Sequence, residues 1–357
     1  MTTISLCMIV KNEEDVLKRC LDSVKEAADE IIIVDTGSTD ATKEIAREYT
    51  DKVYDFTWIN DFSAARNYAF SKAEMDYQMW LDADDVLPER SLREIIALKE
   101  TLNPAVDIVA MKYVTHADAQ GNPIHVSTRE RLIKRANNSQ WMDPVHECIP
   151  LIGNVLYTEI EIHHKKMKAP DNPNRNMDIY AAREAAGQEF SPRQMYYYAR
   201  ELKDHGQWAK ATQYFEMFLD TGNGWFEDNI ATCHALSICY NQLGETEKAL
   251  PILIKSFNYD APRAEICSEI GYFYKHKRAF KTALKWFRFA ASMDKPDTAG
   301  FILWDYYGYI PNIEACVCAC ELGDFAAAHA YNEKAAEYKP DSGAVAHNRV
   351  YLRDVMK

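Results

Sequence analysis

The chain has 357 residues, which is longer than one ordinary domain and fits two. Hydrophobic residues make up 47% of it and aromatic residues 12%, so it can form packed cores and is not an intrinsically disordered protein. Its formal net charge of -13 argues against a protein that binds nucleic acid or anionic membranes, since both need basic patches, and it leaves room for bound cations.

The N-terminus and the cysteines indicate a compartment. The apolar run at 4–10 has no basic segment before it and ends after a few residues, so we interpret it as a buried strand and not as a signal peptide. No run approaches the eighteen or so apolar residues of a transmembrane segment. The nine cysteines are odd in number and mostly lie in apolar helical patterns, which predicts free buried thiols and a reducing cytoplasm.

Residues 1–168 alternate between short apolar strand patterns and amphipathic helical patterns. The expected strands are 4–10, 30–35, 52–56, 77–82, 107–115 and 154–164. The expected helices are 13–27, 41–49, 64–73 and 92–100. This order predicts an α/β domain with a parallel or mixed sheet that is covered by helices on both faces.

A polar stretch with two prolines, 169–176, is expected to be a linker, and residues 177–357 follow a repeating helical pattern. Turn residues recur at spacings of 38, 34 and 45, and an alanine follows each of them five positions later. These turn residues are Gly206, Gly244, Arg278 and Gly323. A period near 34 is the tetratricopeptide signature, which predicts an all-α repeat domain with a groove for extended peptides. The aromatic-rich segment 301–309 also makes a homodimer through the repeats plausible.

Polar motifs follow the predicted strands, at the sheet edge where ligands bind in open α/β folds. They are Lys-Asn-Glu at 11–13, Asp-Thr-Gly-Ser-Thr-Asp at 35–40 and Trp-Leu-Asp-Ala-Asp-Asp at 80–85. Carboxylates packed as closely as those of the third motif repel one another unless a cation lies among them. A glycine-rich dinucleotide or Walker fingerprint is missing, so we expect phosphate to be held through a metal ion.

Six motifs occur in order before the repeats: VKNEE, VDTGSTDAT, WINDFSAARN, WLDADD, PVHE and IHH. With them the chain resembles the inverting family-two glycosyltransferases of the GT-A fold, and within these the tetratricopeptide-bearing branch that includes bacteriocin S-glycosyltransferases. The resemblance implies a Rossmann-like mixed sheet, a UDP-sugar donor and Mn²⁺ or Mg²⁺. It further implies transfer of a hexosyl or N-acetylhexosaminyl group to an acceptor.

The resemblance also implies a metal site. Asp84 is the expected direct ligand, and Asp82 is expected to contact the ribose or the metal's waters. The resemblance gives Asp85 no definite role, and a helix or turn cap before Pro88 is the alternative to a functional one. Adjacent histidines point to opposite faces of a strand, so only one of His163 and His164 can reach the metal, and motif alignment favours His163.

Five further residues are expected to contact the donor by resemblance. Asp35 would accept a hydrogen bond from the pyrimidine N–H and select uracil, unless it only caps the following turn. Lys11, Asn12 and Glu13 would contact the nucleoside, although Glu13 could instead stabilise its own helix dipole. Arg66 would lie near the sugar or the phosphates, with a solvated helix arginine as the alternative.

An inverting transfer needs a base to take the proton of the acceptor. The family usually supplies it from a Glu-Asp pair, whereas this chain has Asp143-Pro-Val-His146-Glu147. By position Glu147 is the candidate base, with His146 as support and Asp143 as the competitor; Glu147 could also merely pair with a lysine. We expect a peptide or protein acceptor. The alternatives are a cell-surface glycan, or a peptide-binding repeat scaffold whose transferase domain is inactive.

Overall fold

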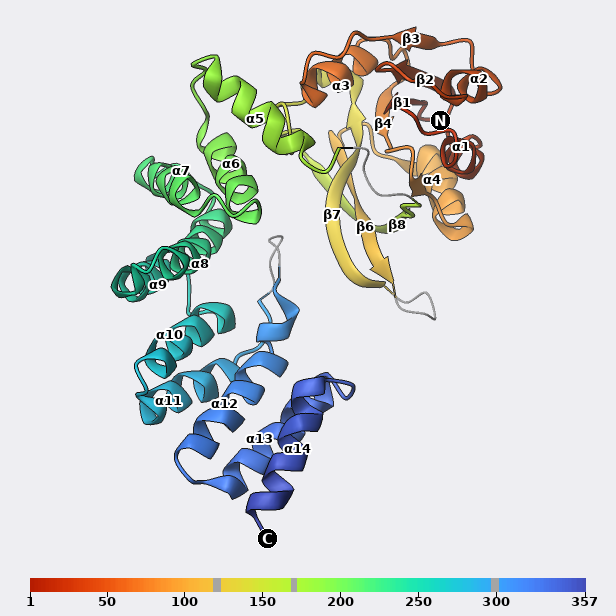
Figure 1. Cartoon of the computed structure of the whole chain (residues 1–357). Helices are drawn as coiled ribbons and strands as arrows, with labels where there is room; N and C mark the ends of the chain where they lie inside the picture. The colour runs from red at the N-terminus through yellow and green to blue at the C-terminus, as the bar shows by residue number, and fades with distance from the viewer. Residues whose placement is uncertain (118–122, 168–171, 297–301) are drawn as a thin grey trace. The chain divides into compact units, whose positions relative to one another are not determined.

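The computed structural model of the chain describes residues 1–117, 123–167, 172–296 and 302–357. It divides into two compact units, Met1–Ala186 and Gly187–Lys357 (Figure 1). This boundary lies later than the expected linker at 169–176, part of which falls outside the described residues. The reason is helix α5 (Arg175–Ala185), which belongs to the first unit. Its Tyr180 is fully buried and donates a hydrogen bond to the carbonyl of Val145 at 3.4 Å.

A mixed sheet in the order β3-β2-β1-β4-β7-β6-β8-β5 forms the centre of the first unit (Figure 1). The strands are β1 (Ile4–Val10), β2 (Glu30–Asp35), β3 (Val53–Asp55), β4 (Tyr77–Trp80), β5 (Asp85–Val86), β6 (Ile108–Ala117), β7 (Pro123–Lys134) and β8 (Val155–His164). The first four strands along the chain, β1 to β4, form parallel pairs in the order β3-β2-β1-β4, as predicted. β7 then pairs antiparallel with both β4 and β6, while β8 is parallel to β6.

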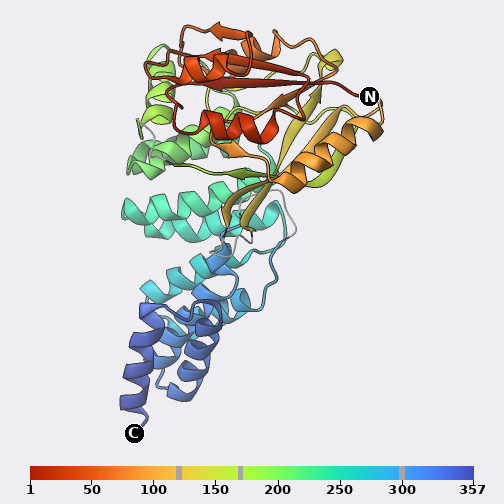
Figure 2. The ribbon, with the colours of Figure 1, turned by 90° about the vertical axis from the view of Figure 1, so that its right-hand side faces the viewer.

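Helices cover both faces of this sheet because its central strands are apolar on both sides. Leu6 and Met8 of β1 pack with α1 (Leu17–Val24), α2 (Thr42–Arg47) and α4 (Glu89–Thr101). Cys7, between them, points the other way and packs with α3 (Phe62–Phe70). In Figure 2, α1 and α4 lie along the same side of the strands. The predicted α/β GT-A-like architecture is therefore confirmed.

The second unit consists of helices that pack on their neighbours along the chain. They are α6 (Pro192–Asp204), α7 (Trp208–Asp220), α8 (Phe226–Gln242), α9 (Ala249–Lys255), α10 (Ala264–His276), α11 (Phe280–Ala291), α12 (Tyr309–Glu321), α13 (Phe325–Tyr338) and α14 (Gly343–Val355). The four predicted turn residues, Gly206, Gly244, Arg278 and Gly323, all have a positive φ, between 58° and 76°. The alanines five positions later are buried. The tetratricopeptide-like repeat is therefore confirmed.

The longer third repeat has a structural cause. Residues just before α12 form a short 3₁₀ helix, Trp304–Tyr306, which packs on α10. The hydroxyl of Tyr306 donates to Glu269 at 2.9 Å, and that of Tyr307 donates to Glu265 at 2.8 Å. Carboxylates on this face of α10 are thus already bound by tyrosines of the same chain. The rest of the predicted aromatic segment falls partly outside the described residues.

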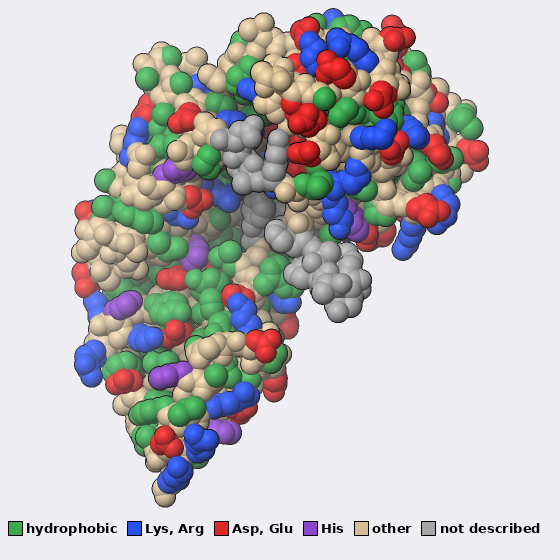
Figure 3. All heavy atoms as spheres, turned by 45° about the vertical axis from the view of Figure 1, so that its right-hand side comes forward, with side chains coloured by type: hydrophobic (Ala, Val, Ile, Leu, Met, Phe, Trp, Pro, Cys, Tyr) green, Lys and Arg blue, Asp and Glu red, His purple; other side chains and the backbone are tan. Residues whose placement is uncertain are grey.

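Three further findings concern the surface, the cysteines and the length and polarity of the helices. Acidic and basic side chains alternate over the face drawn in Figure 3, without an extended basic area in that view. All nine cysteines are free, and most of them are buried. Among the described residues, the helices are all too short or too polar to cross a lipid bilayer.

Candidate active site

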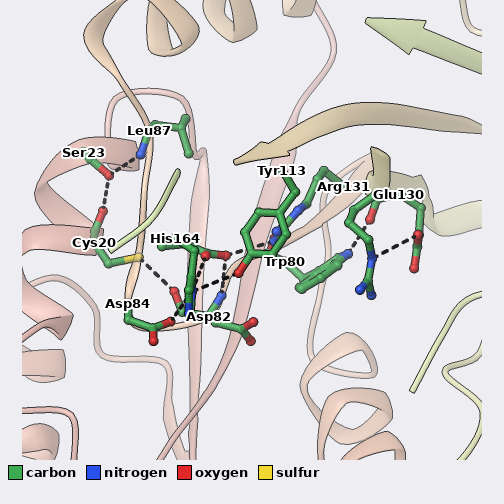
Figure 4. Close-up of polar contacts among 12 residues, drawn as sticks. Cys20, Ser23, Trp80, Asp82, Asp84, Leu87, Tyr113, Glu130, Arg131 and His164 are labelled. Carbon is green, nitrogen blue, oxygen red and sulfur yellow. Dashed lines mark hydrogen bonds and ion pairs between the residues drawn. The ribbon is translucent and has the colours of Figure 1, made fainter. Parts of the chain in front are cut away.

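Asp84, Asp85 and His164 meet where the short strand β5 pairs with the end of β8 (Figure 4). One ligand atom from each lies within 4.8 Å of the others. The imidazole Nδ1 of His164 is 3.3 Å from Oδ1 of Asp84 and 3.6 Å from Oδ1 of Asp85. The hydrogen bond to Asp84 and the nearby negative charge of Asp85 raise the pKa of His164 to about 10, so His164 carries a proton between these carboxylates at neutral pH. A divalent ion would take the place of that proton.

The donor set fits a hard divalent ion, since it offers carboxylate oxygens and one imidazole nitrogen. Oδ1 of Asp85 is buried and has no hydrogen-bond partner, which is costly unless something else satisfies it. The structure places His164 in this cluster rather than His163, which motif alignment favours. His163 lies on the opposite face of β8, where its Nε2 is 2.8 Å from Oε2 of Glu161.

Arg66 joins two of the predicted functional carboxylates. Its Nη2 donates to Oδ1 of Asp82 and its Nε donates to Oε1 of Glu147, each at 2.8 Å. Burial would raise the pKa of Asp82, but the charge and hydrogen bond of Arg66 lower it below its usual range. Arg66 itself is only 7% exposed, so the alternative of a solvated helix arginine does not describe it.

Two indole rings hold the guanidinium of Arg66 in place. Its central carbon lies 4.9 Å from the ring centroids of both Trp80 and Trp141. The side chain comes from the middle of α3, which begins after the N-cap residue Asp61, whose carboxylate accepts from the N–H of Ala64 at 2.9 Å. The position of Arg66 is therefore set by helix capping on one side and by aromatic packing on the other.

Glu147 lies in a tight loop that the structure pins at several points. Backbone hydrogen bonds of 2.9 and 3.1 Å between Met142 and Cys148 close the loop. Inside it, Asp143 and His146 both adopt left-handed backbone angles, with φ of 72° and 56°. Such angles are uncommon in residues other than glycine and persist where the surroundings impose them. Of the two candidate bases, Glu147 is the one that Arg66 links to Asp82.

Asp35, at the end of β2, accepts hydrogen bonds from the N–H groups of Gly37 and Ser38, both at 3.0 Å. The capping role expected as an alternative is thus present. It does not exclude a contact with a base, because a carboxylate has more lone pairs than these two donors use. The cap also holds the Asp35 side chain in one orientation. Asp35 is buried, with 2% of its surface exposed.

The loop after β1 is tied to the loop after β2. Asn12 has a φ of 54°, and its side-chain oxygen accepts from the N–H of Thr39 at 2.9 Å. The N–H of Glu13 donates to the hydroxyl of Thr42 at 2.7 Å. Glu13 lies before α1, which begins at Leu17, so it is not a first-turn helix acid. Lys11 is exposed at the same edge of the sheet.

Two site residues were missed from the sequence. Arg131 of β7 is fully buried and donates to Oδ2 of Asp85 at 3.1 Å. Tyr113 of β6 has its hydroxyl 3.0 Å from Nδ1 of His164 (Figure 4). Burial raises the pKa of Tyr113, so its hydroxyl stays protonated. Arg131 stands in the charged stretch Arg-Glu-Arg, which does not look like a buried strand, and the sequence holds no other signal for it.

Residues 5–152 match the model of the glycosyl transferase family 2. A TPR repeat-containing protein of Synechococcus elongatus is 37% identical over 149 residues, which cover 42% of this chain and 36% of that protein. The glycosyltransferase SunS of Bacillus subtilis is 26% identical over 212 residues, covering 56% of this chain and 49% of SunS. The lipopolysaccharide core biosynthesis glycosyltransferase LpsC of Rhizobium meliloti is 30% identical over 162 residues, covering 43% and 58%. The chain thus spans roughly a third to three fifths of the length of these relatives.

Among solved structures, the TPR protein TTC0263 of Thermus thermophilus is 15% identical with a TM-score of 0.37, covering 51% of this chain and 90% of that one. Glucosyl-3-phosphoglycerate synthase of Mycobacterium tuberculosis, in complex with Mn²⁺ and UDP-glucose, is 14% identical with a TM-score of 0.36, covering 54% and 81%. At such TM-scores these two similarities establish nothing about activity.

Proposed function

We propose that this chain, whose residues 5–152 match the model of the glycosyl transferase family 2, is a metal-dependent inverting transferase that moves a sugar from a UDP-sugar to an acceptor. The observation that carries the proposal is that two groups of residues in this domain are joined by the hydrogen bond from the N–H of Asp82 to Oδ2 of Asp85, at 3.1 Å. One is the Asp84, Asp85 and His164 cluster, and the other is the Asp82 and Glu147 pair that Arg66 joins. The first can hold a cation, and the second includes a carboxylate that can accept a proton.

In this proposal Asp84 and His164 bind Mn²⁺ or Mg²⁺, with Asp85 beside them. When bound, such an ion neutralises the diphosphate and assists departure of UDP as a Lewis acid. Asp82 contacts the ribose or the water shell of the ion, and Arg66 keeps its carboxylate ionised and oriented.

The nucleoside is assigned to the edge formed by the loops after β1 and β2. The carboxylate of Asp35 accepts the N3–H of uracil, whereas cytosine presents an acceptor at the same position and would be repelled. The capping hydrogen bonds from Gly37 and Ser38 support this role because they prevent the carboxylate from turning away. Lys11, Asn12 and Glu13 complete the contacts to the nucleoside.

Glu147 is assigned as the base. Its Oε1 is held by Arg66, so Oε2 is the atom that takes the acceptor's proton. His146 next to it supports this position, and Asp143 remains the alternative. A carboxylate that is oriented in advance can act at once when the acceptor arrives.

The acceptor is proposed to be a peptide or protein that the tetratricopeptide-like unit helps to bind, as such arrays commonly do. A cell-surface glycan is the second candidate, which the similarity to LpsC favours. The third alternative is a repeat scaffold with an inactive transferase domain. The fully buried charges of Asp85 and Arg131 speak against it, since buried charges are costly to keep without a use.

Slow hydrolysis of UDP-glucose and UDP-N-acetylglucosamine, in which water takes the sugar and UDP is released, tests the proposal without knowledge of the acceptor when it is measured with Mn²⁺ and with chelator. Glu147→Gln should lose UDP release while UDP still binds. Glu74→Gln, which alters an exposed carboxylate paired with Lys52, is the matched control. If Asp143→Asn abolishes release and Glu147→Gln does not, Asp143 is the base. If no UDP-sugar is turned over under any metal condition, the assignment as an active transferase is wrong.

A further inference from the structure

Arg131 is a buried cation directly behind the proposed metal site (Figure 4). Its side chain is 0% exposed. Nη1 donates to Oδ2 of Asp85 and to the carbonyl of Trp80, both at 3.1 Å. The guanidinium lies 3.8 Å from the ring centroid of Trp80 and 4.5 Å from that of Tyr113. Its Nε and Nη2 have no hydrogen-bond partner. A buried guanidinium with two unpaired donors is costly, so its charge is expected to have a use.

The use follows from the charges around Asp85. Asp85 is fully buried, and its Oδ2 accepts both from Arg131 and from the N–H of Asp82. Its Oδ1 faces His164. Asp84 and Asp85 bring two negative charges and Arg131 one positive charge, which leaves a net charge of about -1 when His164 is neutral. A divalent ion held by so little protein charge is normally completed by substrate phosphates.

From this geometry we infer that Arg131 makes the metal site dependent on its nucleotide: by cancelling the charge of Asp85, it keeps free divalent ions weakly bound until a diphosphate supplies the missing negative charge. Arg131 is thus a positioning residue that acts through Asp85. The inference rests on the proposed function, since it concerns the same metal and the same donor. It also explains why an arginine, and not an apolar residue, lies behind a cation site.

The test compares the affinity for Mn²⁺ alone with the affinity in the presence of UDP, measured by electron paramagnetic resonance of the unbound ion. In the unaltered protein we expect weak binding of Mn²⁺ alone and much tighter binding with UDP. Arg131→Met should tighten binding of Mn²⁺ alone at least tenfold and reduce the gain from UDP by a similar factor. Arg131→Lys keeps the charge and should retain the dependence on UDP. Arg129→Met is the matched control, because Arg129 also lies over Trp80, at 5.2 Å, but pairs with Glu130.

Variants of Asp85 keep the test informative if Arg131→Met alone does not fold. Asp85→Asn leaves the charge of Arg131 uncompensated and should weaken Mn²⁺ binding, whereas the double variant Asp85→Asn with Arg131→Met should recover it at least tenfold. Thermal unfolding of each variant shows whether it is folded. An unchanged or weaker affinity for Mn²⁺ alone upon removal of Arg131, in both backgrounds, overturns the inference while the proposed function stands. Absence of any Mn²⁺-dependent UDP binding in the unaltered protein would instead overturn the proposed function.

Discussion

Replacing Arg66 by methionine tests whether one buried cation holds the active site together. Methionine keeps an apolar stem between Trp80 and Trp141 and removes the charge that joins Asp82 and Glu147. Removing one partner of a buried ion pair costs about 3–5 kcal/mol. Side chains of Arg66 and Glu147 are 9% and 14% exposed, but that of Asp82 is 39% exposed. Solvent therefore screens the pair of Arg66 with Asp82. We expect Arg66→Met to lower the free energy of unfolding by ~3 kcal/mol at pH 7, the lower end of that range.

The pH dependence of this loss has a defined sign. In the folded protein the pKa of Asp82 lies below the ordinary 3.8, because Arg66 outweighs the effect of burial. A lowered pKa adds stability that is fully present above the pKa of the unfolded chain and is lost as the pH falls through the folded value. The variant lacks this contribution. The difference in unfolding free energy between the two proteins should therefore shrink below about pH 4.

Urea titrations at pH 7 and pH 3.5, followed by tryptophan fluorescence, give the two differences. Arg129→Met serves as the control, since it removes a partly exposed guanidinium over the same Trp80 ring. A loss of unfolding free energy below about 1 kcal/mol for Arg66→Met at pH 7, comparable with a surface ion pair, would show that Arg66 does not act as a buried cation that stabilises the site. An equal loss at both pH values would show that packing, and not charge, is what Arg66 contributes.

Four other substitutions have expected outcomes. Burial raises the pKa of Asp228 to about 6 although Arg193 and Arg200 oppose it, so the folded state is destabilised as the pH rises from 3.8 through 6. Asp228→Asn should therefore stabilise the protein at pH 7, by at most about 3 kcal/mol, and have no effect at pH 3.5, as urea titrations will show. Arg278→Gly should raise the free energy of unfolding by about 1 kcal/mol, because the φ of 58° at this position suits glycine. Gly244→Ala, at the equivalent turn, should lower the free energy of unfolding by about the same amount in the same urea titrations. Asp35→Asn should abolish the preference for UDP over CDP in calorimetric titrations, since an amide can donate to cytosine; a preserved preference would move uracil recognition to another residue.

The sequence predicted best those elements that a single local pattern determines, either a continuous apolar run or a regularly spaced turn residue. Strands 4–10 and 30–35 match β1 and β2 because they are apolar throughout and buried on both sides. The repeat turns were found because left-handed backbone angles select glycine at regular intervals. Arg278 occupies the same angle without being glycine, and only its spacing revealed it.

The elements that were missed depend on contacts distant in sequence. β7 contains Arg-Glu-Arg and looks like a surface segment, yet Arg131 is buried because Asp85 and two aromatic rings surround it. The choice between His163 and His164 depends on which face of β8 meets β5, a strand of only two residues that the sequence does not signal. The motifs gave the candidate site residues one by one, but not that Arg66 links Asp82 to Glu147, since these residues lie 16 and 81 positions from it.

Calorimetric titration shows whether this domain binds a uridine nucleotide through a divalent cation. UDP, CDP and GDP are titrated into the protein with Mn²⁺ and again with chelator, and UDP into Asp84→Ala. We predict binding that requires Mn²⁺, favours UDP over both other nucleotides and is lost in Asp84→Ala. Binding that is equal for the three nucleotides, or unaffected by chelator, would contradict metal-dependent recognition of uridine by this domain.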